Sequence, residues 1–222
     1  MKALLTLWLS LVTSLAAAQV GPSAAEAADY TGLHAAAWRG EAGAVARADR
    51  AALEARDGHG RTPLHLATFA SQREVIRALA KAGAALGAFE NDRYDAVTIA
   101  AVADDEGTLA VLLELGASAG LTTSRYDGTA LIAAAHLGHD GVVRQLIKAG
   151  APLDHVNNLH WTALIEAVVL GDGGARHQRV VQDLLAAGAN AQLTDREGRT
   201  PLALARSRGY AAMVRQFEKA GS

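Results

Sequence analysis

The chain has 222 residues, of which 50% are apolar but only 5% aromatic, and its formal net charge is −2. A weakly negative chain with no run of Lys or Arg lacks the basic surface that general nucleic-acid binding needs. The absence of Cys excludes disulfides, thiolate zinc sites and iron–sulfur clusters, and the small apolar side chains favour closely stacked helices over β-sandwiches.

The N-terminal segment has the pattern of a secretory signal peptide. Lys2 is followed by an apolar stretch at 3–12 and by small residues at 16–18. A positive tip, a short apolar core and an A-x-A site are typical of such signals, whereas a membrane span needs ~20 apolar residues. We expect residues 1–18 to be removed and 19–28 to form a short linker. The mature protein is then soluble and exported, and periplasmic if the source is a Gram-negative bacterium; the alternative is a retained N-terminal anchor.

The rest of the chain repeats with a period near 33. The clearest copy is T-P-L-H-L-A at 62–67. Equivalent starts are spaced by 31, 33, 34, 33 and 38 residues and fall at Thr31, Thr62, Asp95, Thr129, Thr162 and Thr200. A Gly ends most units, at Gly83, Gly116, Gly150, Gly188 and Gly221. The motif and the period resemble the ankyrin repeat over roughly residues 29–221.

Each unit is predicted to contain two helices. Thr or Asp at the start can cap the first helix, and Pro63 and Pro201 fit its first turn. The first helix is short and small, as at 133–135, and the second carries apolar residues at i, i+3 and i+4, as at 142–147. The closing Gly can take a left-handed conformation. We therefore predict an all-α ankyrin-repeat solenoid of about six helix-turn-helix units joined by β-hairpin loops, within a domain at 29–222.

The end units are expected to be atypical, because terminal repeats face solvent on one side. The second helix of the first unit, near 44–48, has only small apolar residues. The last helix, at 214–219, mixes apolar and charged positions, as a capping helix should.

The resemblance implies that hairpin tips and first helices form a concave face that binds another protein. Few aromatic residues occur in the chain, yet several lie close to the repeat starts, and aromatic and Arg side chains are enriched at binding hot spots. The alternative is that each ring covers the base of its own hairpin. The candidate partner-binding residues in these tips are Phe89, Arg93, Tyr94, Arg125, Tyr126, Asp127, Asn157, Asn158 and Trp161.

The fifth unit is longer than the others. It runs 26 residues from Thr162 to its closing Gly, five more than the regular units, and we expect the surplus between its helices at 171–177. Insertions of this kind often lie on the binding face, which adds Glu166, Asp172, Arg176 and His177 to the partner-binding candidates. A plain structural loop is an alternative. A second alternative is a small-ligand- or metal-dependent activity at this insertion, with Glu166, Asp172 and His177 as its polar groups.

No nucleophile elbow, phosphate loop, dinucleotide fingerprint or H-E-x-x-H motif is present. His34 and His65 match the His of the repeat motif, which the resemblance implies is structural. We predict a non-catalytic, monomeric scaffold with no cofactor and no metal, binding a protein partner and not nucleic acid. The sequence around the insertion resembles exported bacterial ankyrin proteins, which implies a role in the cell envelope in support of a periplasmic stress enzyme such as catalase.

Overall fold

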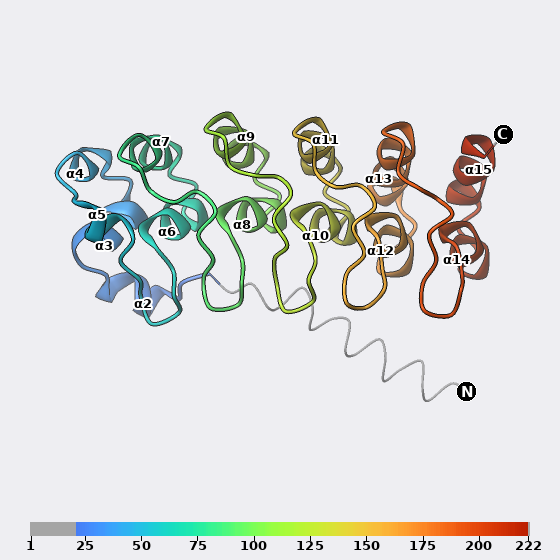
Figure 1. Ribbon diagram of the computed structural model, residues 1–222, viewed down its shortest axis with the longest axis horizontal. Helices are drawn as coiled ribbons and strands as arrows, with labels where there is room; N and C mark the ends of the chain where they lie inside the picture. The colour runs from blue at the N-terminus through green and yellow to red at the C-terminus, as the bar shows by residue number, and fades with distance from the viewer. Residues whose placement is uncertain (1–20, 222) are drawn as a thin grey trace.

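The computed structural model describes residues 21–221. The predicted signal peptide, residues 1–18, lies outside this part of the chain. The described residues form a row of helix pairs that follow one another from the N- to the C-terminal end (Figure 1). Apart from one isolated bridge, between Thr123 and Gly128, they contain no β-pairing. The fold is therefore the predicted all-α solenoid, and its loops have the shape of hairpins without regular strands.

The helix pairs stack as two rows. The first helices are α3 (Gly32–Arg39), α6 (Pro63–Phe69), α8 (Ala96–Val102), α10 (Ala130–Leu137), α12 (Ala163–Val169) and α14 (Pro201–Ser207). The second helices are α4 (Ala42–Val45), α7 (Arg73–Lys81), α9 (Glu106–Glu114), α11 (Asp140–Lys148), α13 (Ala175–Ala186) and α15 (Ala211–Ala220). Each helix contacts the next member of its own row, and the hairpins extend beyond the first helices on one side of the molecule (Figure 1).

The predicted repeat starts are the N-caps of the six first helices. In the third to sixth units the capping side chain accepts a hydrogen bond from the backbone N–H three residues later, as Asp95 does from Thr98. This bond satisfies one of the N–H groups that a helix start leaves without a partner. His65 is structural, as expected, because it contacts Thr62 of its own unit and the carbonyl of Tyr94 in the next.

Most of the closing glycines have a left-handed backbone. The closing glycines of the second to fifth units have φ between 80° and 93°, which a residue without Cβ adopts at little cost. Gly221 differs from the prediction, because its φ is −91° and it remains right-handed.

The surplus of the fifth unit lies only partly between its helices. The turn between α12 and α13 spans residues 170–174, and α13 has 12 residues where α7, α9 and α11 have nine. Residues 175–177, which we expected in the loop, form the first turn of α13. Gly174 supplies an extended N-cap, so a helix can begin directly after the glycine-rich turn.

The N-terminal end is closed by a helix that the sequence reading did not predict. Part of the expected linker forms α2 (Ala24–Asp29), which begins with a capping box between Ser23 and Glu26. Glu26 also pairs with Arg61, whose side chain is almost fully buried. The first unit itself is weak, as expected: α4 has four residues and is followed by another four-residue helix, α5 (Arg50–Leu53).

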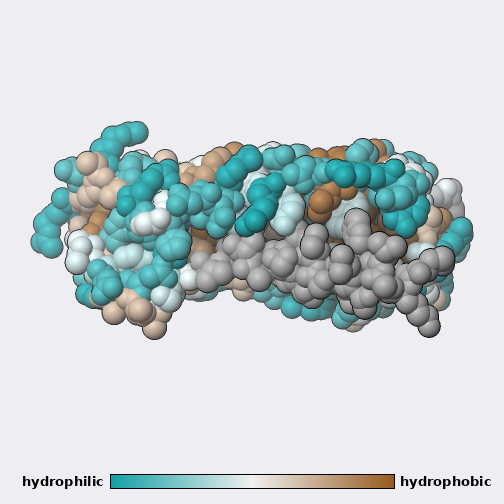
Figure 2. All heavy atoms as spheres, turned by 90° about the horizontal axis from the view of Figure 1, so that it is seen from below, coloured by the Kyte–Doolittle hydropathy of each residue, from teal (hydrophilic) through white to brown (hydrophobic). Residues whose placement is uncertain are grey.

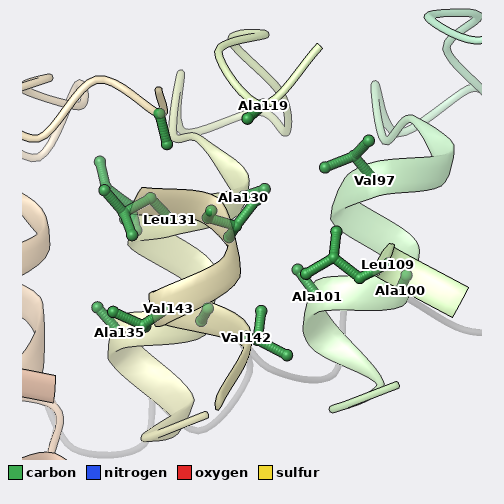
Figure 3. Packing of buried hydrophobic residues seen from close by; sticks show 14 of the residues in the cluster. Val97, Ala100, Ala101, Leu109, Ala119, Ala130, Leu131, Ala135, Val142 and Val143 are labelled. Atoms are coloured by element: carbon green, nitrogen blue, oxygen red, sulfur yellow. The ribbon is translucent and has the colours of Figure 1, made fainter. Parts of the chain in front are cut away.

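The core runs continuously between the two helix rows. First helices supply mainly alanines and second helices mainly leucine, valine and isoleucine, and Figure 3 shows this arrangement from α8 to α11. Alanine lets neighbouring helices approach closely, and the larger side chains fill the remaining space. Because every unit buries its apolar residues against its neighbours, the stack holds the hairpins in fixed positions.

Candidate functional site

A cavity opens among the hairpins and first helices of the third, fourth and fifth units. Its volume is about 60 Å³, which is room for a few water-sized groups. The part of the hairpin side that is not covered by grey atoms in Figure 2 is mainly hydrophilic, with smaller hydrophobic areas between the polar side chains. The cavity is lined by Tyr94, Thr98, Val102, Thr123, Ser124, Tyr126, Gly128, Thr129, Ile132, Ala133, His136, Leu137, Asn157 and Glu166.

The hairpin before the fourth unit is one residue longer than its neighbours. In the next hairpin the closing hydrogen bond joins the N–H of Asn157 to the carbonyl of Trp161, four residues later (3.0 Å). In the longer hairpin it joins Thr123 to Gly128, five residues later (2.8 Å). The additional residue accounts for the spacing of 34 between the third and fourth repeat starts. It also lies in the segment that contributes Tyr126 to the cavity wall.

Backbone hydrogen bonds join successive hairpins. The N–H of Ser124 donates to the carbonyl of Arg93 (3.0 Å), and the N–H of Asn158 donates to the carbonyl of Tyr126 (2.9 Å). The side chain of Asn158 adds a bond to the carbonyl of Arg125 (2.9 Å). The three hairpins around the cavity therefore form one connected wall.

Glu166 is the most unusual lining residue. It lies in the first turn of α12 and is only 3% exposed. The equivalent positions of the other units all hold apolar residues, namely Ala35, Leu66, Ile99, Ala133 and Leu204. Burial raises the pKa of Glu166 to about 8, although a hydrogen bond from Asn157 lowers it in part. At neutral pH the carboxyl therefore carries its proton, because burial disfavours the charged form.

Asn157 links the hairpin to this carboxyl. Its Oδ1 accepts from the backbone N–H groups of Leu159 (3.0 Å) and Trp161 (2.9 Å), which fixes the hairpin turn. Its Nδ2 donates to Oε1 of Glu166 at 2.8 Å. Three other hairpins use an acidic side chain for the same turn, namely Asp57, Glu90 and Asp195. An amide keeps the turn and adds a donor, which a carboxylate does not offer.

His136 lies on the other side of the carboxyl. Its Nδ1 is 3.5 Å from Oε2 of Glu166. Burial lowers the pKa of His136 to about 4, and the nearby His177 and His139 lower it further. Near pH 7 the imidazole and the carboxyl are both neutral.

Tyrosine rings and hydroxyl groups complete the wall. Tyr94 is 8% exposed and burial raises the pKa of its phenol, whereas Tyr126 is half-buried. Thr98 donates to the N-cap side chain of Asp95 (2.6 Å), and its hydroxyl also contacts that of Thr123 (3.3 Å). The cavity thus combines ring surfaces, hydroxyl acceptors and one carboxyl group.

Four of the predicted partner-binding residues line the cavity, from separate stretches of the chain: Tyr94, Tyr126, Asn157 and Glu166. Others form ion pairs across the exposed hairpin tips. Arg93 lies 3.1 Å from Asp127, and Arg125 lies 3.7 Å from Asp92. Phe89 is half-buried, and its carbonyl accepts a hydrogen bond from an Arg of the preceding hairpin.

Trp161 belongs to the core and not to the exposed surface of the hairpins. It is 7% exposed and packs in the continuous hydrophobic cluster. The alternative role, in which a ring covers the base of its own hairpin, describes this residue better. A ring that is buried against its own fold offers little area to a partner.

The residues of the insertion contact one another and the third, fourth and sixth units, and none of them lines the cavity. Nδ1 of His177 lies 2.9 Å from Asp172, and its Nε2 lies 2.9 Å from the carbonyl of His136. Arg176 pairs with Asp140 (3.1 Å) in α11 and with the turn before α9. The predicted grouping of Glu166 with Asp172 and His177 is therefore not formed, because Glu166 faces the cavity between the hairpins.

The sequence reading missed His136 and the threonines as lining residues. His136 lies in the last turn of α10, beside the turn that follows the helix, and nothing in the repeat motif distinguishes a turn residue from a cavity residue there. Glu166 was named for its closeness to the insertion. The stronger signal was its position in the repeat, since Glu166 is an acid where the equivalent residue of every other unit is apolar.

Residues 21–221 contain neither a cluster of metal-ligand side chains nor a helix suited to a bilayer. No three His, Cys, Asp or Glu side chains lie close enough together to hold a metal ion in this part of the chain. None of its helices is both long and apolar enough to span a bilayer.

Comparisons with known proteins identify the fold family. A family model for ankyrin repeats (three copies) matches residues 97–191, and a single ankyrin-repeat model matches residues 59–89. The ankyrin repeat protein YahD of Escherichia coli (strain K12) is 34% identical, over 75% of this chain and 83% of its own length. The chain belongs to the ankyrin-repeat family.

Solved structures agree with this family. An ankyrin repeat domain from Acinetobacter baumannii AYE is 40% identical, with a TM-score of 0.79, and the match covers 85% of this chain and 97% of that one. The ankyrin repeat protein EF0377 is 28% identical with a TM-score of 0.75, covering 85% of this chain and 98% of that one. Ankyrin-repeat domains are generally non-enzymatic scaffolds for protein–protein interaction.

Proposed function

We propose that this chain is a non-catalytic scaffold that binds another protein through the hairpins and first helices of its third, fourth and fifth units. The observation that carries the proposal is the cavity in that face, whose mainly apolar wall includes one buried acid. Its wall contains Glu166, a buried acid at a position that every other unit fills with an apolar residue. A buried polar group costs stability. The other units fold with an apolar residue such as Leu or Ala at this position, so we infer that Glu166 serves a purpose other than folding.

The geometry of the stack supports a protein as the ligand. The three hairpins form one connected wall, and such a preformed surface loses little conformational entropy on binding. Exposed Arg93 and Arg125 and half-buried Tyr126 lie on these hairpins. Arg and Tyr side chains are among those that contribute most to protein interfaces.

The experiment is affinity capture followed by a direct binding measurement. The tagged protein, purified from its own host, is used as bait in host extract, and each captured candidate is then purified and titrated by calorimetry. We expect one candidate to bind directly and Tyr126→Ala to weaken its binding about tenfold or more. The control is Arg215→Ala, an exposed side chain on α15. Equal binding by Tyr126→Ala and the wild type, with equal far-UV spectra, would exclude this surface.

We also propose that the protein acts in the bacterial cell envelope. The support is the sequence pattern of residues 1–18 and the resemblance to exported bacterial ankyrin proteins, which makes a periplasmic stress enzyme the first partner to test. N-terminal sequencing of the protein released by osmotic shock is expected to begin near residue 19. Recovery of the unprocessed chain from the cytoplasm alone would contradict export.

A further inference from the structure

We propose that the cavity receives the ammonium group of a lysine side chain from the bound protein, with Glu166 as its acceptor. The inference rests on the proposed function, since it assumes that the occupant belongs to a protein partner. Its starting point is that an acidic side chain has been placed, nearly inaccessible to bulk solvent, in the wall of a cavity between hairpins.

One oxygen of the carboxyl remains available. Oε1 of Glu166 accepts from Asn157 at 2.8 Å. The contact of Oε2 with His136 is 3.5 Å, which is longer than the 2.7–2.9 Å of a charge-assisted hydrogen bond. A single available oxygen suits an ammonium group, which acts as a compact charge with three donors. A guanidinium group is bound best by both oxygens of a carboxylate.

The rest of the wall also suits a cation. Tyr94 and Tyr126 line the cavity, and tyrosine rings attract cations at their faces. The hydroxyl groups of Thr98 and Thr123 each keep acceptor capacity. The lining includes no Lys or Arg. The volume of about 60 Å³ is enough for an ammonium group with its nearest methylenes.

Binding is expected to release a proton. Without a ligand, burial holds the pKa of Glu166 at about 8. An ammonium ion near Oε2 favours the carboxylate, so the carboxyl proton passes to solvent as the ion pair forms. The polar groups in contact with Glu166 are His136 from α10 and Asn157 from the preceding hairpin, and Tyr94 and Tyr126 line the same cavity.

The other charged groups nearby do not act directly on the protonation of Glu166. His177 of α13 acts on the site only through His136, and Arg206 of α14 pairs with Glu218 (2.7 Å). Affinity for an ammonium probe should therefore rise about tenfold per pH unit between pH 6 and 7 and level off above pH 8.

The test uses n-butylammonium, which matches the end of a lysine side chain, followed through amide chemical shifts of the full chain. We expect saturable shifts around Glu166 and His136, with methylguanidinium and neutral butanol each at least fivefold weaker. Glu166→Gln should weaken n-butylammonium at least tenfold, whereas Glu74→Gln, which changes an exposed acid on α7, should not. Equal binding of butanol, or unchanged binding to Glu166→Gln, would overturn the inference.

A second arm separates this inference from the scaffold proposal. The captured partner is acetylated on its lysines and titrated again, and we expect at least a tenfold loss of affinity. Unchanged binding of the acetylated partner would overturn the lysine assignment and leave the scaffold intact. Binding of n-butylammonium in a protein that captures no partner would contradict the scaffold and make a free amine the occupant.

Discussion

Replacing Glu166 with Gln should change how stability depends on pH. The folded chain holds a proton on Glu166 up to a pKa of about 8, whereas the unfolded chain loses it near 4.5. Since the folded state binds more protons in this range, stability falls as pH rises. Between pH 6.5 and 8.5 the loss is on the order of 2 kcal/mol, at about 1.4 kcal/mol per pKa unit. Gln keeps the acceptor for Asn157 and has no proton to lose, so the variant should gain stability over the wild type by that amount.

The measurement is urea unfolding by far-UV circular dichroism at pH 6.5, 7.5 and 8.5, with a constant m-value as the check on two-state behaviour. The range begins at pH 6.5 because burial lowers the pKa of His65 and His136 to about 4. The unfolded chain titrates these histidines near 6.5, so they make stability rise with pH mainly below that value and by only about 0.4 kcal/mol each above it. This rise is the same in the wild type and the variants, so the Glu166 effect is read as the difference between their curves. Glu74→Gln is the control and should run parallel to the wild type. If Glu166→Gln also runs parallel, the carboxyl is ionised in the folded chain and the reasoning fails.

Three further predictions concern the turns and the core that support the site, and each is tested by urea unfolding. Gly150→Ala should lower the free energy of unfolding by about 1–2 kcal/mol, because the residue has a φ of +80° and no neighbour near its Cβ. Gly138→Ala should lower it by about 2–4 kcal/mol, because its new Cβ would also lie 2.8 Å from the His177 ring. Equal losses would mean that His177 moves freely. Tyr210→Phe should cost about 1 kcal/mol through loss of the 2.9 Å bond to a carbonyl of the fifth-unit turn, and no change would show that this turn is held otherwise. Leu146→Ala, in the core, should cost about 2–5 kcal/mol; a cost below 1 kcal/mol would contradict close packing there.

The repeat architecture could be predicted from the sequence because its signals are backbone requirements. A residue such as Thr129 must cap a helix, and one such as Gly150 must allow a left-handed turn, in every unit alike. Side chains with these properties recur at fixed spacing whatever packs around them. The helix at 24–29 carries no such recurrence, since it occurs once, and its capping box was overlooked within an apparent linker.

The candidate site could be predicted only residue by residue. Tyr94, Tyr126 and Asn157 were named as separate features of three hairpins, and stacking at a period near 33 makes them neighbours. The exposure of each side chain depends on packing that the repeat pattern does not contain. Trp161 therefore looked like Tyr126 in the sequence, although one ring is in the core and the other at the cavity.

The departures from the repeat converge on one place, and this is the main reason to regard the cavity as a site. The longer hairpin brings Tyr126, the amide Asn157 replaces an acid, and Glu166 replaces an apolar residue. The first and last of these changes are not needed for folding, because other units fold with the shorter hairpin and with Leu or Ala. The amide follows from the acid, since it donates to Oε1 of Glu166 while keeping its own turn. These changes lie together, fit one another, and include a buried acid that costs stability. Such a combination is expected of a binding pocket built on a repeat scaffold.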